Sequence, residues 1–212
     1  MTDLQQLTLA IESGDRGAAV AVTRAAIDEG LDPATILGAM TAAMEIVGER
    51  FQRNEIYVPE MLIAARAMKE ATAVLEPVLV SAGIRPEHTA IIGTVKGDLH
   101  DIGKNLVAMM WKGANIEVID LGTNVPPDRF VAAAREYGAR LVGVSALLTT
   151  TMGGMRDVVT AIRAADSPQV RVIIGGAPVT AEFAEQIGAD GFAPNAASAV
   201  DVARRLLGVP VP

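Results

Sequence analysis

The stretch TAIIGTVKGDLHDIGKN at residues 89–105 decides the fold prediction. It begins with a short apolar run, 89–94, which favours a buried strand. A polar turn follows, and a helical pattern starts at Ile102. A strand, a loop and a helix in this order form the first half of a βαβ unit, so the sequence predicts a parallel sheet with helical crossovers.

The same alternation continues toward the C-terminus. Short apolar runs between helical patterns predict an α/β fold, namely a doubly wound parallel five-stranded sheet that is Rossmann-like, with helices on both faces and the flavodoxin-like strand order 2-1-3-4-5. The expected strands cover 89–94, 117–120, 140–145, 170–174 and, weakly, 191–193, and the expected helices cover 102–112, 127–137, 152–165, 180–187 and 196–207.

Residues 1–83 have only helical patterns. A capping box of Thr2 and Gln5 is expected to open the first helix, and the second is expected over 15–29. The third starts at Asp32-Pro33 and ends at Asn54, where residue types that favour turns begin. Pro59 opens the fourth helix, and Pro77 is expected to kink or end it.

Four amphipathic helices with short loops predict an N-terminal four-helix bundle. The segment 84–88, which contains a proline and follows Gly83, separates it from the sheet. The expected domains are therefore a helical cap at 1–83, a linker at 84–88 and the α/β domain at 89–212.

Composition excludes several classes of function. The 212 residues include 25 acidic and 18 basic side chains, a net charge of −7, which argues against nucleic-acid binding. The chain has no cysteine, so thiolate metal sites and disulfides are excluded, and its two histidines, His88 and His100, leave little room for a multi-histidine metal site. No apolar run is long enough for a membrane helix and the N-terminus has no signal-peptide pattern, so we expect a cytoplasmic protein.

The carboxyl ends of the first, third and fourth expected strands should meet at the topological switch point, where doubly wound sheets bind ligands. The first of these loops contains Asp98 and His100, two residues apart. A carboxylate at that distance can hold one ring nitrogen of a histidine whose other nitrogen binds a metal. The alternative is that His100 is an ordinary surface histidine.

The other two loops are also unusual in composition. Residues 145–151 contain Ser145 and three threonines, and Gly175-Gly176 follows the fourth strand. Hydroxyls could serve a ligand, but they are also common helix caps. Paired glycines could admit a flat group, but they are also common in turns.

The three loops together form a more specific pattern. Asp98-x-His100-x-x-Gly103 is followed after 41 residues by Ser145-x-Leu147 and after 27 more by Gly175-Gly176. This pattern resembles the base-off, histidine-on cobalamin-binding domains of methionine synthases and of the corrinoid proteins of anaerobic methyltransferase systems. The stretch 54–62, NEIYVPEML, resembles the helical cap of those families, so the resemblance covers nearly the whole chain.

The resemblance implies a role for each matched residue. His100 would be the lower axial ligand of cobalt, with Asp98 holding its other nitrogen. Thr151, which lies six positions after Ser145, would complete the relay where methionine synthase has serine. The implied cofactor-binding loop contains Gly97, Asp101, Ile102 and Gly103, and the implied channel for the nucleotide tail contains Ser145, Leu147, Thr149, Gly175, Gly176 and Asn195.

The helical cap would cover the upper face of the cofactor. Tyr57 and Met61 match positions that would shield the methyl group on cobalt from water. The alternative for both side chains is ordinary packing between helices.

The implied cofactor is cobalamin, alternating between methylcobalamin and cob(I)alamin. The protein would be a methyl carrier that receives the methyl group from a substrate-specific methyltransferase. It would pass the group to a second methyltransferase acting on tetrahydrofolate or a thiol, and a reductive activase is a possible third partner.

Three other functions remain open. A cobalamin-dependent sensor would share both domains but usually adds a basic DNA-binding domain. A carbon-skeleton mutase subunit would face a barrel and use adenosylcobalamin. A receiver domain would need an acidic pair after the first strand and would leave the helical part unexplained.

Overall fold

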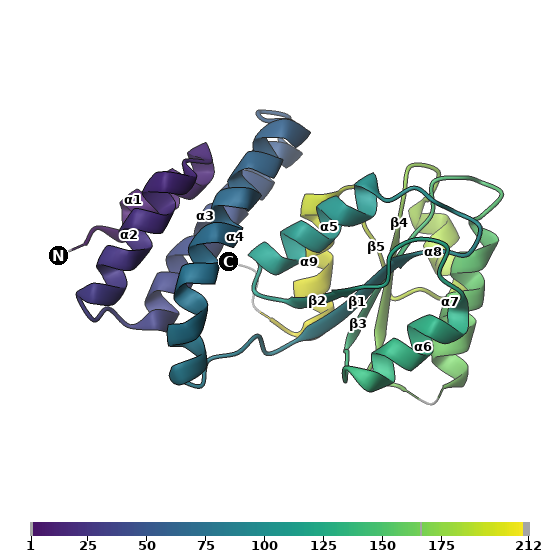
Figure 1. Cartoon of the computed structure of the whole chain (residues 1–212). Helices are drawn as coiled ribbons and strands as arrows, with labels where there is room; N and C mark the ends of the chain where they lie inside the picture. The colour runs from purple at the N-terminus through teal and green to yellow at the C-terminus, as the bar shows by residue number, and fades with distance from the viewer. Residues whose placement is uncertain (1, 166, 210–212) are drawn as a thin grey trace. The chain divides into compact units, whose positions relative to one another are not determined.

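The computed structural model describes residues 2–165 and 167–209, which divide into two compact units. One unit comprises Met1–Pro86 with Gly113–Asn115, and the other comprises Glu87–Lys112 with Ile116–Pro212. The first break falls inside the segment 84–88, while the domain boundaries themselves stay a prediction. The first unit holds the helices α1 to α4, and the second holds the sheet and the helices α5 to α9 (Figure 1).

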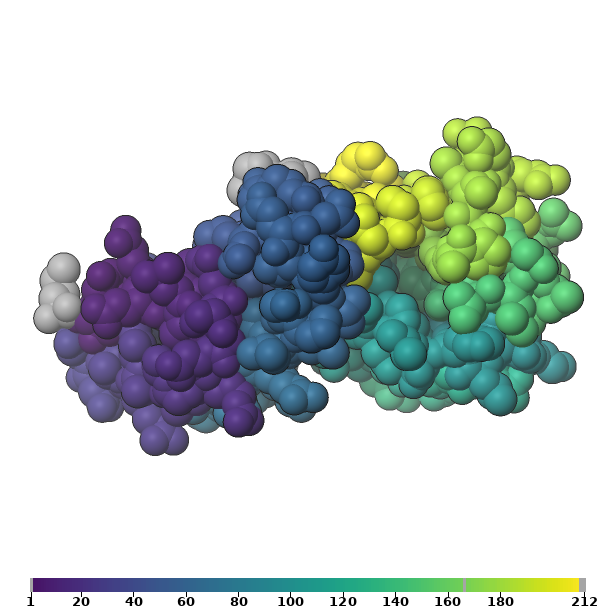
Figure 2. All heavy atoms as spheres, turned by 90° about the horizontal axis from the view of Figure 1, so that it is seen from above, coloured from purple at the N-terminus to yellow at the C-terminus, as the bar shows by residue number. Residues whose placement is uncertain are grey.

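The four helices of the first unit pack side by side (Figure 1 and Figure 2). An aspartate side chain accepts a backbone amide hydrogen at the start of each of the first three helices: Asp3, Asp15 and Asp32. Each such cap satisfies one of the amides that a helix leaves without an internal partner. The helices are α1 (Leu4–Ser13), α2 (Arg16–Asp28), α3 (Pro33–Gln52) and α4 (Val58–Ser81).

One expectation about these helices is wrong, and of the two outcomes expected at Pro77, a kink or an end, the end is wrong. The capping box of Thr2 and Gln5 does not form, because Asp3 is the cap and its carboxylate accepts the amide of Gln5 at 2.9 Å. Pro77 does not end α4, which continues to Ser81. A proline removes one hydrogen bond from the helix, and the buried Leu79 in the following turn stabilises the helix beyond it.

The second unit contains a parallel sheet with the predicted order β2-β1-β3-β4-β5. Helices α6, α7 and α8 lie on one face, and α5 and α9 lie on the other (Figure 1). The strands are β1 (Thr89–Thr94), β2 (Glu117–Asp120), β3 (Leu141–Ser145), β4 (Arg171–Gly175) and β5 (Gly191–Phe192). The helices are α5 (Ile102–Gly113), α6 (Pro127–Glu136), α7 (Gly153–Ala164), α8 (Ala181–Ile187) and α9 (Ala196–Leu207).

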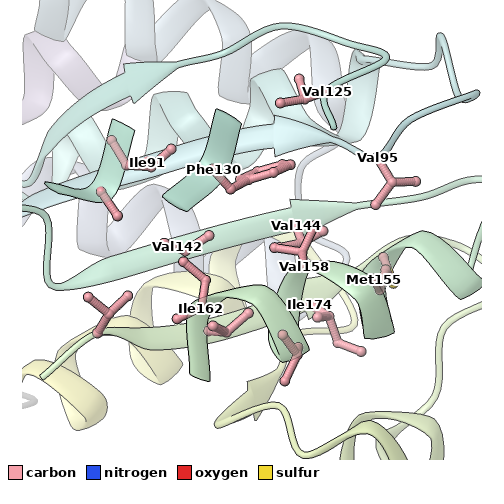
Figure 3. Close-up of a cluster of buried hydrophobic side chains, with 14 of the residues drawn as sticks. Ile91, Val95, Val125, Phe130, Val142, Val144, Met155, Val158, Ile162 and Ile174 are labelled. Carbon is pink, nitrogen blue, oxygen red and sulfur yellow. The ribbon is translucent and has the colours of Figure 1, made fainter. Parts of the chain in front are cut away.

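The sheet is buried on both faces, as a doubly wound sheet requires. On one face, Phe130 of α6 packs beneath β1, and Met155, Val158 and Ile162 of α7 pack on the central strands (Figure 3). On the other face, the buried Trp111 of α5 donates its indole hydrogen to the carbonyl oxygen of Ala199 in α9 at 2.9 Å. The core thus fixes the central strands, whose ends carry the site.

Sequence boundaries differ from the observed ones by about one residue. Thr180, for example, was expected inside α8 but is its cap, and its hydroxyl oxygen accepts the amide of Phe183. A cap residue lies only half inside the helix, so a boundary read from sequence can include it. Among the residues described, no helix is both long and apolar enough to cross a lipid bilayer.

Candidate functional site

The three loops expected to carry the site start side by side. Thr94 at the end of β1 pairs with Ser145 at the end of β3, and Ser145 pairs with Gly175 at the end of β4. These pairs are in parallel register, so the following segments all leave the same edge of the sheet. The structure therefore brings the histidine loop (residues 95–101), the threonine-rich loop (146–152) and the Gly175-Gly176 turn to one place.

The histidine and the aspartate of the first loop are bonded to each other. The ring atom Nδ1 of His100 lies 2.7 Å from Oδ1 of Asp98. The same carboxylate oxygen accepts the backbone amide of His100 at 3.0 Å. Two bonds from one residue to one oxygen fix both the backbone and the ring of His100 relative to Asp98.

The second carboxylate oxygen of Asp98 is held by the threonine-rich loop. Oδ2 accepts the amide of Leu147 at 2.8 Å, the amide of Leu148 at 3.3 Å and the hydroxyl of Thr151 at 2.8 Å. Burial of the Asp98 side chain alone would raise its pKa. The hydrogen bonds, led by the amides of His100 and Leu147, outweigh burial and hold the pKa of Asp98 well below its usual range.

The charge on Asp98 determines the tautomer of His100. An ionised carboxylate can only accept hydrogen bonds, so Nδ1 of the neutral imidazole must carry the hydrogen. The lone pair is then on Nε2. The side chain of His100 is 51 % exposed while that of Asp98 is 0 % exposed, so a buried anion orients an accessible imidazole.

Backbone contacts that the sequence did not indicate also hold the histidine loop. The buried hydroxyl of Thr94 donates to the carbonyl oxygen of His100 at 2.9 Å. The amide of Gly97 donates to the side-chain oxygen of Asn124 at 2.8 Å. Thr94 ends β1 and Asn124 follows β2 at this edge of the sheet. A polar residue at such a position is the only sequence signal that could have indicated either of them.

Large apolar side chains near His100 in the sequence and in the neighbouring loop are exposed. Leu99 and Ile102 flank His100 and are 73 % and 75 % exposed, and Leu147 and Leu148 of the neighbouring loop are each 42 % exposed. A β-carbon built at Gly103 would meet nothing within 4 Å, so this helix start is open. Exposed apolar side chains around an oriented donor are typical of a binding surface.

The glycine pair serves the packing of the loops themselves. A β-carbon at Gly176 would lie 1.9 Å from the carbonyl oxygen of Ala146, and its φ of 142° is one that other residues rarely adopt. A β-carbon at Gly175 would lie 3.0 Å from the carbonyl oxygen of Ala193. Gly176 therefore lets the turn approach the threonine-rich loop, and Gly175 lets it approach the segment after β5.

Other residues expected at the site have local roles. The Asp101 carboxylate accepts a hydrogen bond from Asn105 at 3.0 Å. Asn195 caps α9 by accepting the amide of Ser198 at 2.8 Å. Ser145 is half-buried at the end of β3, and Thr149 is exposed.

The two residues expected from the helical cap belong to the other unit. Tyr57 precedes α4 and is 66 % exposed, and its amide donates to Glu60 at 3.1 Å. Met61 is fully buried. Their relation to cobalt stays a prediction.

The donor set fits a metal that arrives inside a cofactor. Within residues 2–165 and 167–209, no group of three or more histidine, cysteine, aspartate or glutamate side chains could hold a metal ion. One imidazole nitrogen alone cannot build a protein metal site, but it can complete the coordination of a metal already held by a macrocycle. The exposed leucines and isoleucine match such an apolar ring.

Comparisons with known proteins agree with this chemistry. Models described as B12 binding domains match residues 88–201 and residues 3–76. The chain is 37 % identical to a corrinoid protein of Desulfitobacterium hafniense over 98 % of this chain and 99 % of that protein. It is 40 % identical to dimethylamine corrinoid protein 1 of Methanosarcina mazei over 96 % and 95 % of the two chains.

Solved structures are similar over the same length. A cobalamin-binding protein from Desulfitobacterium hafniense has a TM-score of 0.83 at 32 % identity, covering 97 % of this chain and 99 % of that one. The methanol:cobalamin methyltransferase complex of Methanosarcina barkeri contains a chain with a TM-score of 0.86 at 26 % identity, covering 98 % and 80 %. The chain therefore belongs to the B12-binding corrinoid proteins of methyltransferase systems, with cobalamin as its cofactor.

Proposed function

We propose that this corrinoid protein carries a methyl group on cobalamin bound in the base-off, histidine-on form. In this form the nucleotide base of the cofactor leaves cobalt and His100 takes its place. The observation that carries the proposal is the 2.7 Å contact between Nδ1 of His100 and the buried Asp98, which leaves Nε2 of an exposed ring as the donor. When bound, the cobalt of cobalamin supplies the centre that accepts and releases the methyl group.

The residues of the chain control the orientation of His100. The hydrogen bond from Nδ1 to the Asp98 carboxylate orients the ring and keeps the lone pair on Nε2. Thr151 and the amides of the threonine-rich loop keep that carboxylate in place through their bonds to Oδ2.

The nucleotide tail of the cofactor would lie along the loops next to His100. Their backbone atoms are already bonded to one another, whereas the side chain of Thr149 is exposed. The proposed lining consists of Ser145, Leu147, Thr149, Gly175, Gly176 and Asn195. Within the cofactor loop, Gly97, Asp101, Ile102 and Gly103 would contact the ring, and the exposed Ile102 and open Gly103 suit that role best.

The helical unit would protect the methyl group. Tyr57 is a large, exposed aromatic side chain, which suits a surface that excludes water from the upper face of the ring. Met61 is fully buried, so it would act indirectly, through the packing of α4. The proposed domain division is a cap at 1–83, a linker at 84–88 and the cobalamin domain at 89–212.

The partners would be two methyltransferases. The first would be specific for the methyl donor, and the names of the relatives point to a small methylated compound such as a methylamine or methanol. The second would pass the methyl group to tetrahydrofolate or a thiol. A reductive activase would return the cofactor to its active oxidation state.

The histidine ligand is tested by absorption spectroscopy of the protein reconstituted with cobalamin. Wild type, His100→Ala and His88→Gln are compared, because His88 is the only other histidine. We expect wild type and His88→Gln to share one spectrum and His100→Ala to lose it. If His100→Ala keeps the wild-type spectrum, another group is the ligand and the proposal fails.

A further inference from the structure

The loop between β2 and α6, residues 121–126, is bonded to the histidine loop beyond the ends of the strands. Thr94 donates its amide to the carbonyl oxygen of Gly122 and accepts the amide of Val125, both at 2.9 Å. Val95 and Val125 form a further parallel bridge. The two loops therefore continue the β1–β2 pairing to the point where the histidine loop turns.

Asn124 makes the last two contacts in this series. Its side-chain oxygen accepts the amide of Gly97 at 2.8 Å, and its own amide donates to the carbonyl oxygen of Asp98 at 3.0 Å. Its φ of 55° is left-handed, a conformation that asparagine, aspartate and glycine adopt more readily than other residues. In this conformation Asn124 bonds the Gly97 amide on one side of the Asp98 side chain and the Asp98 carbonyl on the other.

We propose that Asn124 is a positioning residue for the cobalt ligand. It acts through the backbone on either side of the Asp98 side chain and so sets the direction in which the carboxylate presents Oδ1 to the imidazole of His100. Its hydrogen bonds go to Gly97 and Asp98 and not to the imidazole. This inference rests on the proposed ligation by His100 and adds a residue outside the motif of aspartate, histidine and glycine.

Three variants separate the hydrogen bond from the backbone strain. Asn124→Gly keeps the left-handed backbone and loses the acceptor for Gly97. Asn124→Asp keeps both the left-handed preference and an acceptor oxygen. Asn115→Gly is the matched control, since Asn115 also has a positive φ, 60°, but lies at the turn between α5 and β2, away from the edge that carries the histidine loop.

The readouts are cobalamin affinity, the absorption spectrum, and the nitrogen-15 NMR signals of the histidine rings in the cofactor-free protein. With only two histidines in the chain, His100 is assigned by its disappearance in His100→Ala. For Asn124→Gly we expect roughly five- to tenfold weaker binding, as for one lost hydrogen bond, and an Nδ1 hydrogen of His100 that exchanges faster. Asn124→Asp and Asn115→Gly should match wild type in both respects.

The proposal is overturned if Asn124→Gly folds and matches Asn115→Gly in affinity and in the His100 signals. If Asn124→Gly does not fold, hydrogen exchange of wild type decides. The Gly97 amide belongs to an exposed residue and donates to Asn124, so this bond should protect it from exchange, and an unprotected amide would refute the idea. Failure of the ligand assignment is distinct, because it appears as an unchanged spectrum in His100→Ala.

Discussion

Removing the hydroxyl of Thr151 should weaken the anchor of Asp98, and it also removes the contact of this hydroxyl with the carbonyl oxygen of Leu148 at 2.9 Å. Thr151→Val keeps the size of the side chain and loses the donor to Oδ2 at 2.8 Å. A hydrogen bond to a charged group contributes about 1.5–3 kcal/mol, and because Thr151 is half-buried the lower value applies. We expect a loss of about 1.5 kcal/mol, which corresponds to a fall of roughly 3–6 °C in Tm.

The pH dependence of this loss identifies its cause. The folded-state pKa of Asp98 lies below its unfolded value, so its bonds stabilise the protein above the unfolded pKa of about 3.9. That contribution is lost as the pH falls through the folded pKa. The difference between wild type and Thr151→Val should therefore be constant from about pH 5 to 8 and decrease in more acidic solution.

The assay is urea unfolding of the cofactor-free protein from about pH 8 to pH 5 and in more acidic solution. Thr151→Ser retains the hydroxyl and should stay close to wild type. Thr150→Val changes an exposed neighbour in the same way and serves as the control. Equal stability of Thr151→Val and Thr150→Val at neutral pH would refute the reasoning.

Three further changes test the same edge of the sheet. Gly176→Ala should cost more than about 2 kcal/mol or prevent folding, because its β-carbon would lie 1.9 Å from the Ala146 carbonyl oxygen; normal thermal unfolding would contradict this. Gly103→Ala should leave the stability of the cofactor-free protein unchanged or up to about 1 kcal/mol higher, yet weaken cobalamin binding in titration; unchanged affinity would mean that the ring does not approach this helix start. Asp98→Asn should cost at least about 2 kcal/mol in urea unfolding, since its amide group would face donors, and a stable variant with wild-type spectra would remove Asp98 from the account.

Most of the fold could be predicted from the sequence, because the composition of the strands and their alternation with helices indicated the same architecture. The run at 89–94 has the β-branched, apolar composition of a buried strand, and the glycine-marked alternation after it admits few topologies. Right-handed crossovers limit the possible strand orders, and the flavodoxin-like order predicted among them, β2-β1-β3-β4-β5, is confirmed. The cap expected at Thr2 and the helix end allowed for at Pro77 do not occur, because a neighbouring side chain or tertiary packing outweighed a local preference.

The site could be predicted only where a contact depends on the type of side chain. Asp98 and His100 are two residues apart, so their contact could be inferred, and the place of Thr151 followed from the family pattern. The amides of Leu147 and Leu148 could not be inferred, because every residue has an amide and only the fold aims these two at Asp98. Asn124 was missed for the same reason, since its role depends on a left-handed backbone that its sequence neighbours do not specify.

The central claim is that Nε2 of His100 coordinates cobalt. The most direct measurement is electron paramagnetic resonance of the protein loaded with cob(II)alamin, because the unpaired electron couples to the nitrogen on the lower axis. In protein that contains nitrogen-15 only in histidine, the three-line nitrogen splitting should become a two-line splitting. The same change is expected in His88→Gln labelled in the same way. A splitting that stays three-line in the labelled protein would show that the nitrogen on cobalt does not come from histidine, and would contradict the account.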